Sequence, residues 1–262
     1  MVTFQILSDL HSELLMETLP LLLPKAEYLF LAGDITNINY KLKSCKIFFK
    51  YCNDNWTKTI YIPGNHEYYS ASNTIHEMKI KYKNFFEENN LNNIVFLDND
   101  IYEIQKDIFI IGSTFWTKSP FSIDISQKNL LNDYNYIFWE KKQKILPHNI
   151  NNLSKTDHDF IIKQINNLKN KQIIVITHFP PYTTHPKFLN ESFAMKQYFS
   201  WPNDILINFN KFNNIKYWIS GHTHYSYDFT INNIRLISKQ YGYKNESIVN
   251  EPNYNSELVC MI

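Results

Sequence analysis

Short apolar runs of strand length recur along the chain, and each of them ends directly at polar residues. The runs are rich in Ile, Leu, Val, Phe and Tyr, and they cover residues 4–7, 28–32, 59–62, 173–176 and 217–219. Continuous apolar runs of this length are typical of strands that are buried on both faces of a sheet. We therefore expect these five segments to form the centre of the fold.

Segments with mixed apolar and charged spacing separate several of these runs. Residues 39–51, 74–88 and 156–169 show the pattern of surface helices. Thr156-Asp157 would begin the third helix, with a carboxylate in its first turn. Because strands alternate with helices, the pattern predicts an α/β fold.

After residue 94 the pattern changes to short strands of the kind found in hairpins. Residues 95–97, 108–111 and 229–236 have this character, and the last segment has a turn at Asn232-Asn233. The stretch 119–155 is the least regular and is either a lid or a surface excursion. No repeat or linker-like boundary interrupts the chain, so a single domain over 1–262 is the simpler prediction.

Composition and charge narrow the class of protein without identifying it. The 262 residues carry a net charge of +1, which gives no strong field to attract nucleic acid or an anionic membrane. Three unpaired cysteines, Cys45, Cys52 and Cys260, fit a reduced chain without disulfides. The apolar stretch 14–23 is too short to span a membrane and lacks a basic leader. We expect a soluble, cytoplasmic protein, and the sequence leaves its oligomeric state open.

The polar residues that end the five apolar runs are candidate metal ligands. In sequence order they are Asp9, His11, Asp34, Asn65, His178, His222 and His224, and His66 follows Asn65 directly. Asp9 and His11 are two residues apart, as are His222 and His224, so in an extended segment each pair would point to one side. Carboxylates and imidazoles without thiolates suit manganese, iron, zinc or a similar divalent ion. Seven ligands are too many for one tetrahedral site but suit two octahedral ions.

Each motif alone has an ordinary interpretation. Gly33-Asp34 could be only a turn, and Gly64-Asn65-His66 a tight bend with a capping Asn. His178 alone could be a core imidazole, and the Gly-His-Thr-His motif that begins at Gly221 could bind one structural zinc. It is the order of all five motifs, each at the end of a strand, that favours a shared site. Ligands of α/β sheets bind at the carboxyl ends of strands.

The motif series resembles the calcineurin-like metallophosphoesterase superfamily. The resemblance rests on Asp-x-His, Gly-Asp-x-x-Asn, Gly-Asn-His-Glu, a strand-terminal His and Gly-His-x-His, which extend from Asp9 to His224. It implies a four-layer αββα sandwich with two mixed sheets and a binuclear site at one end. By resemblance, one metal would be held by Asp9, His11 and His224. The other would be held by Asn65, His178 and His222, with Asp34 bridging both.

The resemblance also implies a reaction and roles for further residues. A hydroxide that bridges the two metals would attack phosphorus in line, and His66 would protonate the leaving group. Either Glu67 or Asp34 would orient His66. Manganese is the first expectation for both ions, with iron, zinc, nickel or magnesium as alternatives.

Some features separate this chain from relatives within the superfamily. Asn37 stands where purple acid phosphatases have a Tyr ligand. Arg235 is the only arginine and lies beyond the last motif, which disfavours a protein phosphatase, since those enzymes grip phosphate with arginines. A non-catalytic scaffold would show a defective ligand set, and none is visible. A nuclease of the superfamily would favour a basic stripe, which the near-neutral balance does not support.

Several aromatic and polar residues could line the mouth of the site, although core aromatics and rigid turns are their more ordinary interpretation. They are Phe115-Trp116, Asn132-Asp133-Tyr134, Pro180-Pro181-Tyr182 and His185. Aromatic side chains beside a metal site suit stacking on a base. We therefore expect a small phosphorylated substrate, with a nucleotide-like one among the candidates. The sequence does not choose among monoester, diester and pyrophosphate.

Overall fold

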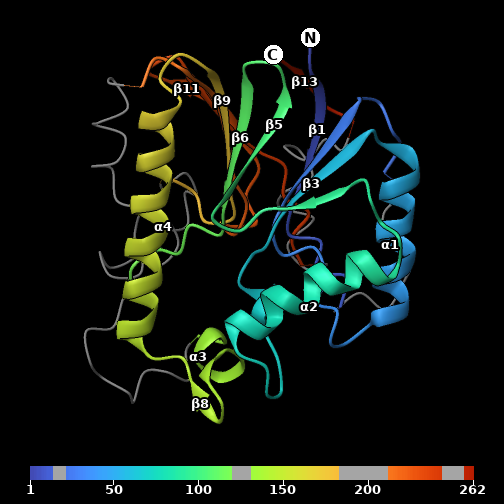
Figure 1. Cartoon of the computed structure of the whole chain (residues 1–262), viewed down its shortest axis with the longest axis vertical. Coiled ribbons are helices and arrows are strands. Elements are labelled where there is room, and N and C mark those ends of the chain that lie inside the picture. The colour runs from blue at the N-terminus through green and yellow to red at the C-terminus, as the bar shows by residue number, and fades with distance from the viewer. Residues whose placement is uncertain (14–21, 120–130, 183–211, 244–256) are drawn as a thin grey trace.

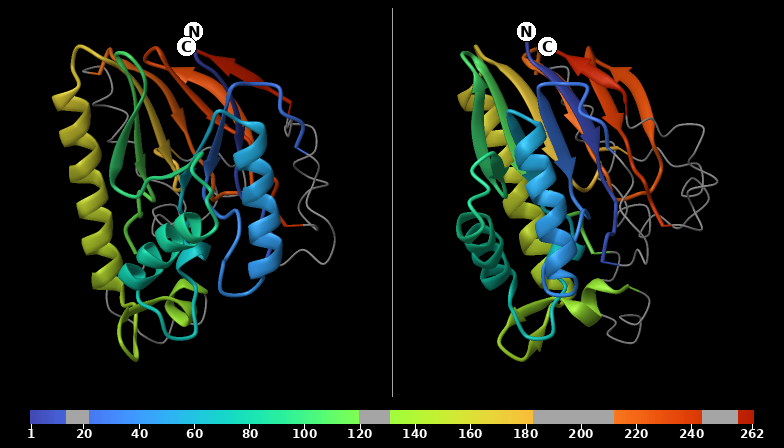
Figure 2. Two further views of the ribbon diagram at one scale, coloured as in Figure 1. Left: turned by 45° about the vertical axis from the view of Figure 1, so that its right-hand side comes forward. Right: turned by 90° about the vertical axis from the view of Figure 1, so that its right-hand side faces the viewer.

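The structure, a computed structural model, contains two large mixed sheets packed face to face. It describes residues 1–13, 22–119, 131–182, 212–243 and 257–262. Helices cover the outer face of each sheet, α1 and α2 on one side and α4 on the other (Figures 1 and 2). The predicted four-layer sandwich is confirmed.

The first sheet has the strand order β13-β1-β2-β3-β4. Its four parallel strands are β1 (Thr3–Leu7), β2 (Tyr28–Ala32), β3 (Lys58–Ile62) and β4 (Ile94–Phe96). The last strand, β13 (Val259–Met261), pairs antiparallel with β1 and brings the two termini together. The segment 95–97 therefore contributes to a parallel edge strand, not to the hairpin that its short apolar pattern predicted.

The second sheet has the strand order β11-β12-β10-β9-β6-β5. Its four central strands are parallel: β6 (Ile108–Ser113), β9 (Gln172–Thr177), β10 (Ile215–Ile219) and β12 (Ile234–Ser238). The edges β5 (Asp100–Gln105) and β11 (Tyr227–Ile231) are antiparallel to their neighbours. The turn between β11 and β12 is at Asn232-Asn233 as predicted, and both residues have positive φ, as a type I′ hairpin turn requires.

Alternating positions along the strands build three separate hydrophobic clusters. In β2, Phe30 faces the second sheet and packs with residues such as Ile176, whereas Leu29 and Leu31 face α1 and α2. On the far side, β9 sends Val175 toward α4. Both faces of each central strand are covered. The strands therefore have continuous apolar sequences, and their apolar and polar residues do not alternate.

The two helices that cover the first sheet lie close to their predicted positions. They are α1 (Leu42–Asn55) and α2 (Ile75–Glu88). Thr74 and Glu77 form a capping box at the start of α2, each side chain accepting a hydrogen bond from the other's backbone N–H. These local signals explain why the beginning of this helix could be predicted from sequence.

The third helix begins nine residues earlier than predicted, which corrects the expected start at Thr156-Asp157. Helix α4 covers Pro147–Asn167, with Pro147 at its first helical position. The Asn149 side chain accepts a hydrogen bond from the backbone N–H of Leu146.

The irregular stretch 119–155 therefore contains the first part of this helix. It also contains α3 (Asp133–Tyr136) and the short hairpin β7 (Phe138–Glu140) and β8 (Gln143–Lys144). Residues 120–130 of the expected lid lie outside the described part.

The three cysteines are free and buried. None of the helices in the described residues is both long enough and apolar enough to cross a membrane.

Candidate metal centre

The loops that follow five strands meet at one end of the two sheets. β1, β2 and β3 contribute Asp9 and His11, Asp34, and Asn65, while β9 and β10 contribute the three remaining histidines, His178, His222 and His224. Backbone hydrogen bonds tie these loops to one another: the N–H of Asp9 donates to the carbonyl of Gly33, and that of His11 to the carbonyl of Asp34. The predicted ligands are therefore brought together from segments more than 200 residues apart.

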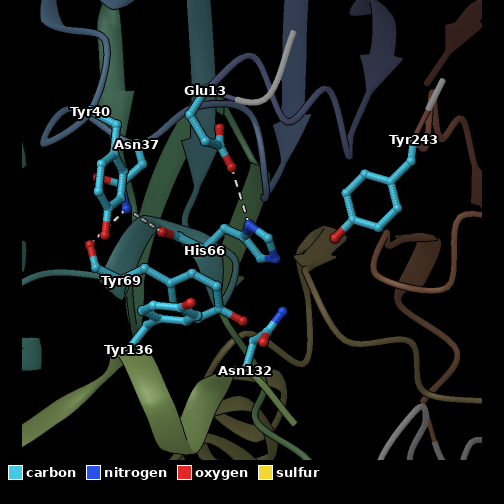
Figure 3. Close-up of a pocket in the computed structure, with 8 residues that line it drawn as sticks. All are labelled: Glu13, Asn37, Tyr40, His66, Tyr69, Asn132, Tyr136 and Tyr243. Carbon is cyan, nitrogen blue, oxygen red and sulfur yellow. Dashed lines mark hydrogen bonds and ion pairs between the residues drawn. The ribbon is translucent and has the colours of Figure 1, made fainter. Parts of the chain in front are cut away.

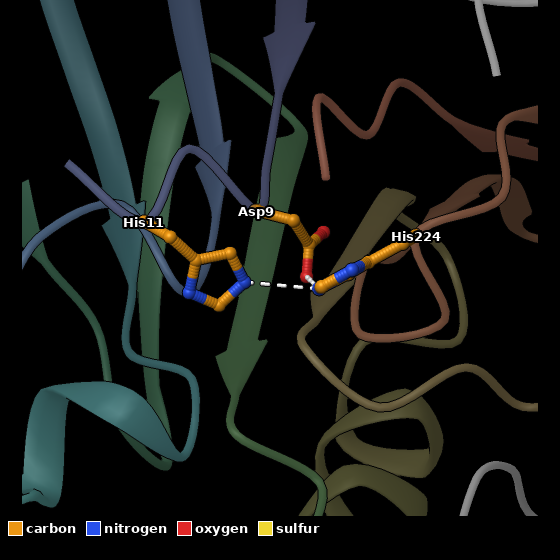
Figure 4. Close-up of side chains that lie close together, drawn as sticks. All are labelled: Asp9, His11 and His224. Atoms are coloured by element: carbon orange, nitrogen blue, oxygen red, sulfur yellow. Dashed lines mark hydrogen bonds and ion pairs between the residues drawn. The ribbon is translucent and has the colours of Figure 1, made fainter. Parts of the chain in front are cut away.

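The first group consists of Asp9, His11 and His224 (Figure 4). The Nε2 atoms of His11 and His224 lie 2.9 Å apart, and His224 Nε2 lies 3.7 Å from Asp9 Oδ1. Two imidazole nitrogens at this distance can share at most one proton. At least one of the two Nε2 atoms therefore directs a lone pair into the space between them. Such an arrangement suits a cation.

The second group consists of Asp34, His178 and His222, with Asn65 beside them. His178 Nδ1 donates to the carbonyl oxygen of Ala32, which leaves Nε2 directed toward the site. That Nε2 lies 3.0 Å from Asn65 Oδ1, 3.3 Å from His222 Nδ1 and 3.4 Å from Asp34 Oδ2.

Asp34 Oδ2 lies between the two groups. It is 3.4 Å from His178 Nε2 in the second group and 3.7 Å from His11 Nε2 in the first. Burial alone would raise the pKa of Asp34, but the histidines, His178 first, hold it well below its usual range. Asp34 is therefore an anionic acceptor with access to both groups, and the donor set of the site fits two divalent ions.

Five of the candidate ligands have a left-handed backbone conformation that is uncommon for residues other than glycine. Their φ angles are 55° for Asp9, 45° for His11, 53° for Asp34, 74° for His222 and 54° for His224. Each such residue costs roughly 1–3 kcal/mol, so the surrounding structure must impose it. Nearby glycines leave the room that is required: a Cβ on Gly64 would collide with Asp34, and one on Gly221 with Asp9.

Glu67 has a different place from the one expected. Its carboxylate is fully buried and accepts hydrogen bonds from the backbone N–H groups of Gly64, Asp34, Ile35 and Thr36 and from the Tyr61 hydroxyl. It therefore holds the loops after β2 and β3 together and does not contact the His66 ring. Burial, together with the charge of Asp34, raises the pKa of Glu67 to about 7.

Glu13 is the carboxylate that faces His66. Its Oε1 lies 3.1 Å from His66 Nδ1 and 3.6 Å from His11 Nδ1, and all three side chains are largely buried. Asp34 contacts the backbone of His66, accepting a hydrogen bond from its N–H at 2.9 Å, while its Oδ2 lies 4.0 Å from Nε2. Burial alone would lower the pKa of His66, but Asp34 and Glu13 raise it to about 9. No pattern in the sequence points to Glu13, which follows the first motif in an irregular segment.

Three further residues that support the site were not assigned these roles from sequence. Asp133 is buried and accepts hydrogen bonds from the Asn65 amide at 2.8 Å and the Tyr69 hydroxyl at 2.7 Å, which directs Asn65 Oδ1 toward the histidines. The Asn37 amide donates to the carbonyls of His66 and Tyr69 and so fixes the turn η1 (His66–Tyr68). Tyr243 packs over His11 and His224, with ring centroids 4.6 and 4.5 Å away.

Most of the candidates for the mouth of the site are core residues. Phe115, Trp116 and Tyr134 are buried, which confirms their ordinary interpretation, and Tyr182 packs on Phe229 of β11. Asn132 does line a cleft beside His66. His185 lies outside the described residues. Arg235 forms a bidentate ion pair with Asp228 on the β11–β12 hairpin, which leaves it no role at the site.

Comparison with known proteins places the chain in a family. Residues 2–226 match the family described as calcineurin-like phosphoesterase, and the chain belongs to it. The family and the site together support a metal-dependent phosphoesterase.

The chain is similar in sequence to a viral protein and in fold to solved structures. The chain is 33% identical over 237 residues to the uncharacterised protein L509 of Acanthamoeba polyphaga mimivirus, covering 84% of this chain and 79% of that protein. Its fold is similar to that of the phosphopantetheinyl hydrolase PptH from Mycobacterium tuberculosis, with a TM-score of 0.59, 15% identity, and coverage of 95% of this chain and 93% of that one. It is also similar to a dimetal phosphatase from Danio rerio, with a TM-score of 0.53, 11% identity and coverage of 91% and 87%.

Proposed function

We propose that this protein hydrolyses phosphate esters at a centre of two divalent metal ions. The observation that carries the proposal is the convergence of buried carboxylate, amide and imidazole atoms from the ends of five strands. Asp9, His11 and His224 would hold one ion, and Asn65, His178 and His222 the other. Asp34 would bridge both, because its Oδ2 is close to nitrogens of each group. When bound, such a pair of ions neutralises the phosphate and lowers the pKa of the attacking water.

His66 is the proposed proton donor to the leaving group. Its side chain is turned toward the cleft, and Glu13 accepts from Nδ1, so Nε2 is left to face the substrate (Figure 3). As the bond between phosphorus and the ester oxygen breaks, His66 would pass a proton from Nε2 to that oxygen. Asn37 and Asp34 keep the backbone of His66 in place during this transfer.

Metal analysis combined with a substrate panel tests the proposal. The purified protein is stripped of metal and reloaded with Mn, Ni, Zn, Mg or none, and hydrolysis of a mono-aryl and a bis-aryl phosphate is measured. We expect two ions per chain with manganese and activity that a chelator abolishes. Which of the two esters is cleaved sets the subclass.

Asp34→Asn is the informative variant, because it nearly preserves the volume of the side chain while removing the proposed bridging charge. It should lose metal and activity together. Arg235→Lys, on the distant hairpin, is the control and should retain both. Two bound ions without hydrolysis of either ester would refute the catalytic proposal and favour the scaffold alternative.

A further inference from the structure

A cleft of about 400 Å³ opens beside His66, on the side where a leaving group would depart. Its walls come from five separate parts of the chain, and Glu13 in the segment after β1 is one of them (Figure 3). Tyr40 precedes α1, Tyr69 follows the turn η1, Asn132 and Tyr136 belong to the region of α3, and Tyr243 closes the opposite side.

Two of these tyrosines are exposed in a way that distinguishes them from other aromatic residues. Tyr40 is 54% exposed and Tyr136 is 46% exposed. Among the residues that the structure describes, every other aromatic side chain is buried or half-buried. A large aromatic ring that remains in water at the mouth of a cleft is suited to cover a flat ligand.

The rings form a continuous row that leads outward from the proposed proton donor. The centroids of His66 and Tyr69 are 4.3 Å apart, and those of Tyr69 and Tyr136 are 5.5 Å apart, both with tilted planes. Asp133 anchors the Tyr69 hydroxyl and so fixes the middle ring. The Asn132 side chain reaches toward the same space and offers an amide donor and acceptor (Figure 3).

The charge of the cleft argues against an anionic leaving group. Glu13 contributes a carboxylate, and no lysine or arginine is among the described lining residues. Lys41, next to Tyr40 in the chain, donates to the carbonyl of Ser12, and Lys81 donates to Asn39. A departing phosphate, as in pyrophosphate cleavage, would face Glu13, and the one cationic side chain of the described lining, His66, is already paired with that carboxylate. A neutral alcohol needs no such counter-charge.

We propose that this cleft binds the leaving group of the substrate, and that the leaving group is a nucleoside whose base stacks on Tyr40 and Tyr136. The proposal rests on the phosphoesterase function proposed above. In the reaction, the oxygen of water forms a bond to phosphorus and the bond from phosphorus to the nucleoside oxygen breaks. That oxygen takes the proton from His66 Nε2, and the products are a nucleoside and a phosphate that retains any second ester.

The test compares substrates that share the same leaving oxygen but differ in the base. The first pair is a nucleoside 5′-monophosphate and ribose 5-phosphate. The second pair consists of the methyl diesters of these two compounds. Inorganic pyrophosphate is the fifth substrate. We expect the manganese-loaded protein to cleave the base-bearing member of one pair with a kcat/KM about 10- to 100-fold higher, which is the range that stacking of a base on aromatic rings supplies.

Variants at the two exposed tyrosines identify the source of this preference. The double variant Tyr40→Ala and Tyr136→Ala should reduce the ratio to about one, whereas Tyr40→Phe and Tyr136→Phe keep the rings and should retain most of it. Ile47→Ala, at an exposed apolar position on α1, is the matched control and should leave the ratio unchanged.

The outcomes separate this inference from the function on which it rests. Three outcomes would overturn the inference while the phosphoesterase function stands. They are equal kcat/KM within both pairs, a preference for the base that survives the double alanine variant, and a preference for pyrophosphate. Failure of the two-metal protein to cleave any of the substrates would overturn both.

Discussion

Replacing Glu13 by Gln tests the proposed proton donor most directly. Glutamine retains nearly the same volume, but removes the charge that lies 3.1 Å from His66 Nδ1. A hydrogen bond to a charged group contributes about 1.5–3 kcal/mol. At about 1.4 kcal/mol for each factor of ten in rate, its loss should slow the protonated step about 10- to 100-fold.

The size of the effect should depend on the leaving group. An alkoxide is a poor leaving group and needs the proton, so Glu13→Gln should slow hydrolysis of alkyl phosphates by that full factor. Nitrophenolate leaves without help, and hydrolysis of nitrophenyl esters should change by less than about threefold. The assay measures kcat for a series of esters of graded leaving-group acidity, together with the metal content of each sample.

Two controls make this result interpretable. Glu87→Gln replaces an exposed glutamate on α2 and should change neither rate nor metal content. Because Glu13 also lies 3.6 Å from His11 Nδ1, metal content is measured for each variant. An equal loss of rate on alkyl and nitrophenyl esters, with both metals retained, would show that Glu13 acts on the attacking side or on the fold and would refute the reasoning.

Three further predictions follow from the structure. His66→Ala should retain both metals and lower turnover of alkyl esters by about 10²–10⁴-fold, and loss of metal in this variant would contradict its role as a donor. Gly64→Ala should lower the metal content measured by elemental analysis, because the new Cβ would collide with Asp34, and full loading would contradict this. Burial raises the pKa of Cys45 and Cys260 to about 11, and that of Cys52 further still. In a thiol-reagent assay at pH 8, fewer than about one in a hundred of these thiols is ionised, so labelling should require unfolding, and rapid labelling of the native protein would count against the packing.

The pattern of apolar and polar residues made the central strands and the first two helices predictable. The five apolar runs form β1, β2, β3, β9 and β10, and the apolar and charged spacing of residues 74–88 predicted the start of α2 within one residue. The start of α4 was missed because the asparagines before Thr156 have weak helix propensity, and tertiary packing overrides it. Pro147 was the available signal, since proline is favoured in the first turn of a helix.

The convergence of the candidate ligands was predictable because each lies at the end of a strand, where parallel topology brings chain segments together. The residues around them were not. Glu13 and Asp133 reach the site from irregular segments whose path depends on tertiary contacts. Glu67, which follows His66 in sequence, was one of two candidates to orient it, yet its carboxylate turns inward to four backbone N–H groups. Adjacency in a tight turn does not determine the direction of a side chain.

The left-handed backbone at five ligand positions bears on which part of the molecule carries the strain. Asp9, His11 and Asp34 occupy conformations that glycine adopts without strain. Substitution of a candidate ligand by glycine would relieve roughly 1–3 kcal/mol of local strain while removing a donor atom from the proposed metal site. In the metal-free chain the loops would therefore keep their path after such a substitution, so the strain belongs to the proposed site and not to the sandwich that carries it.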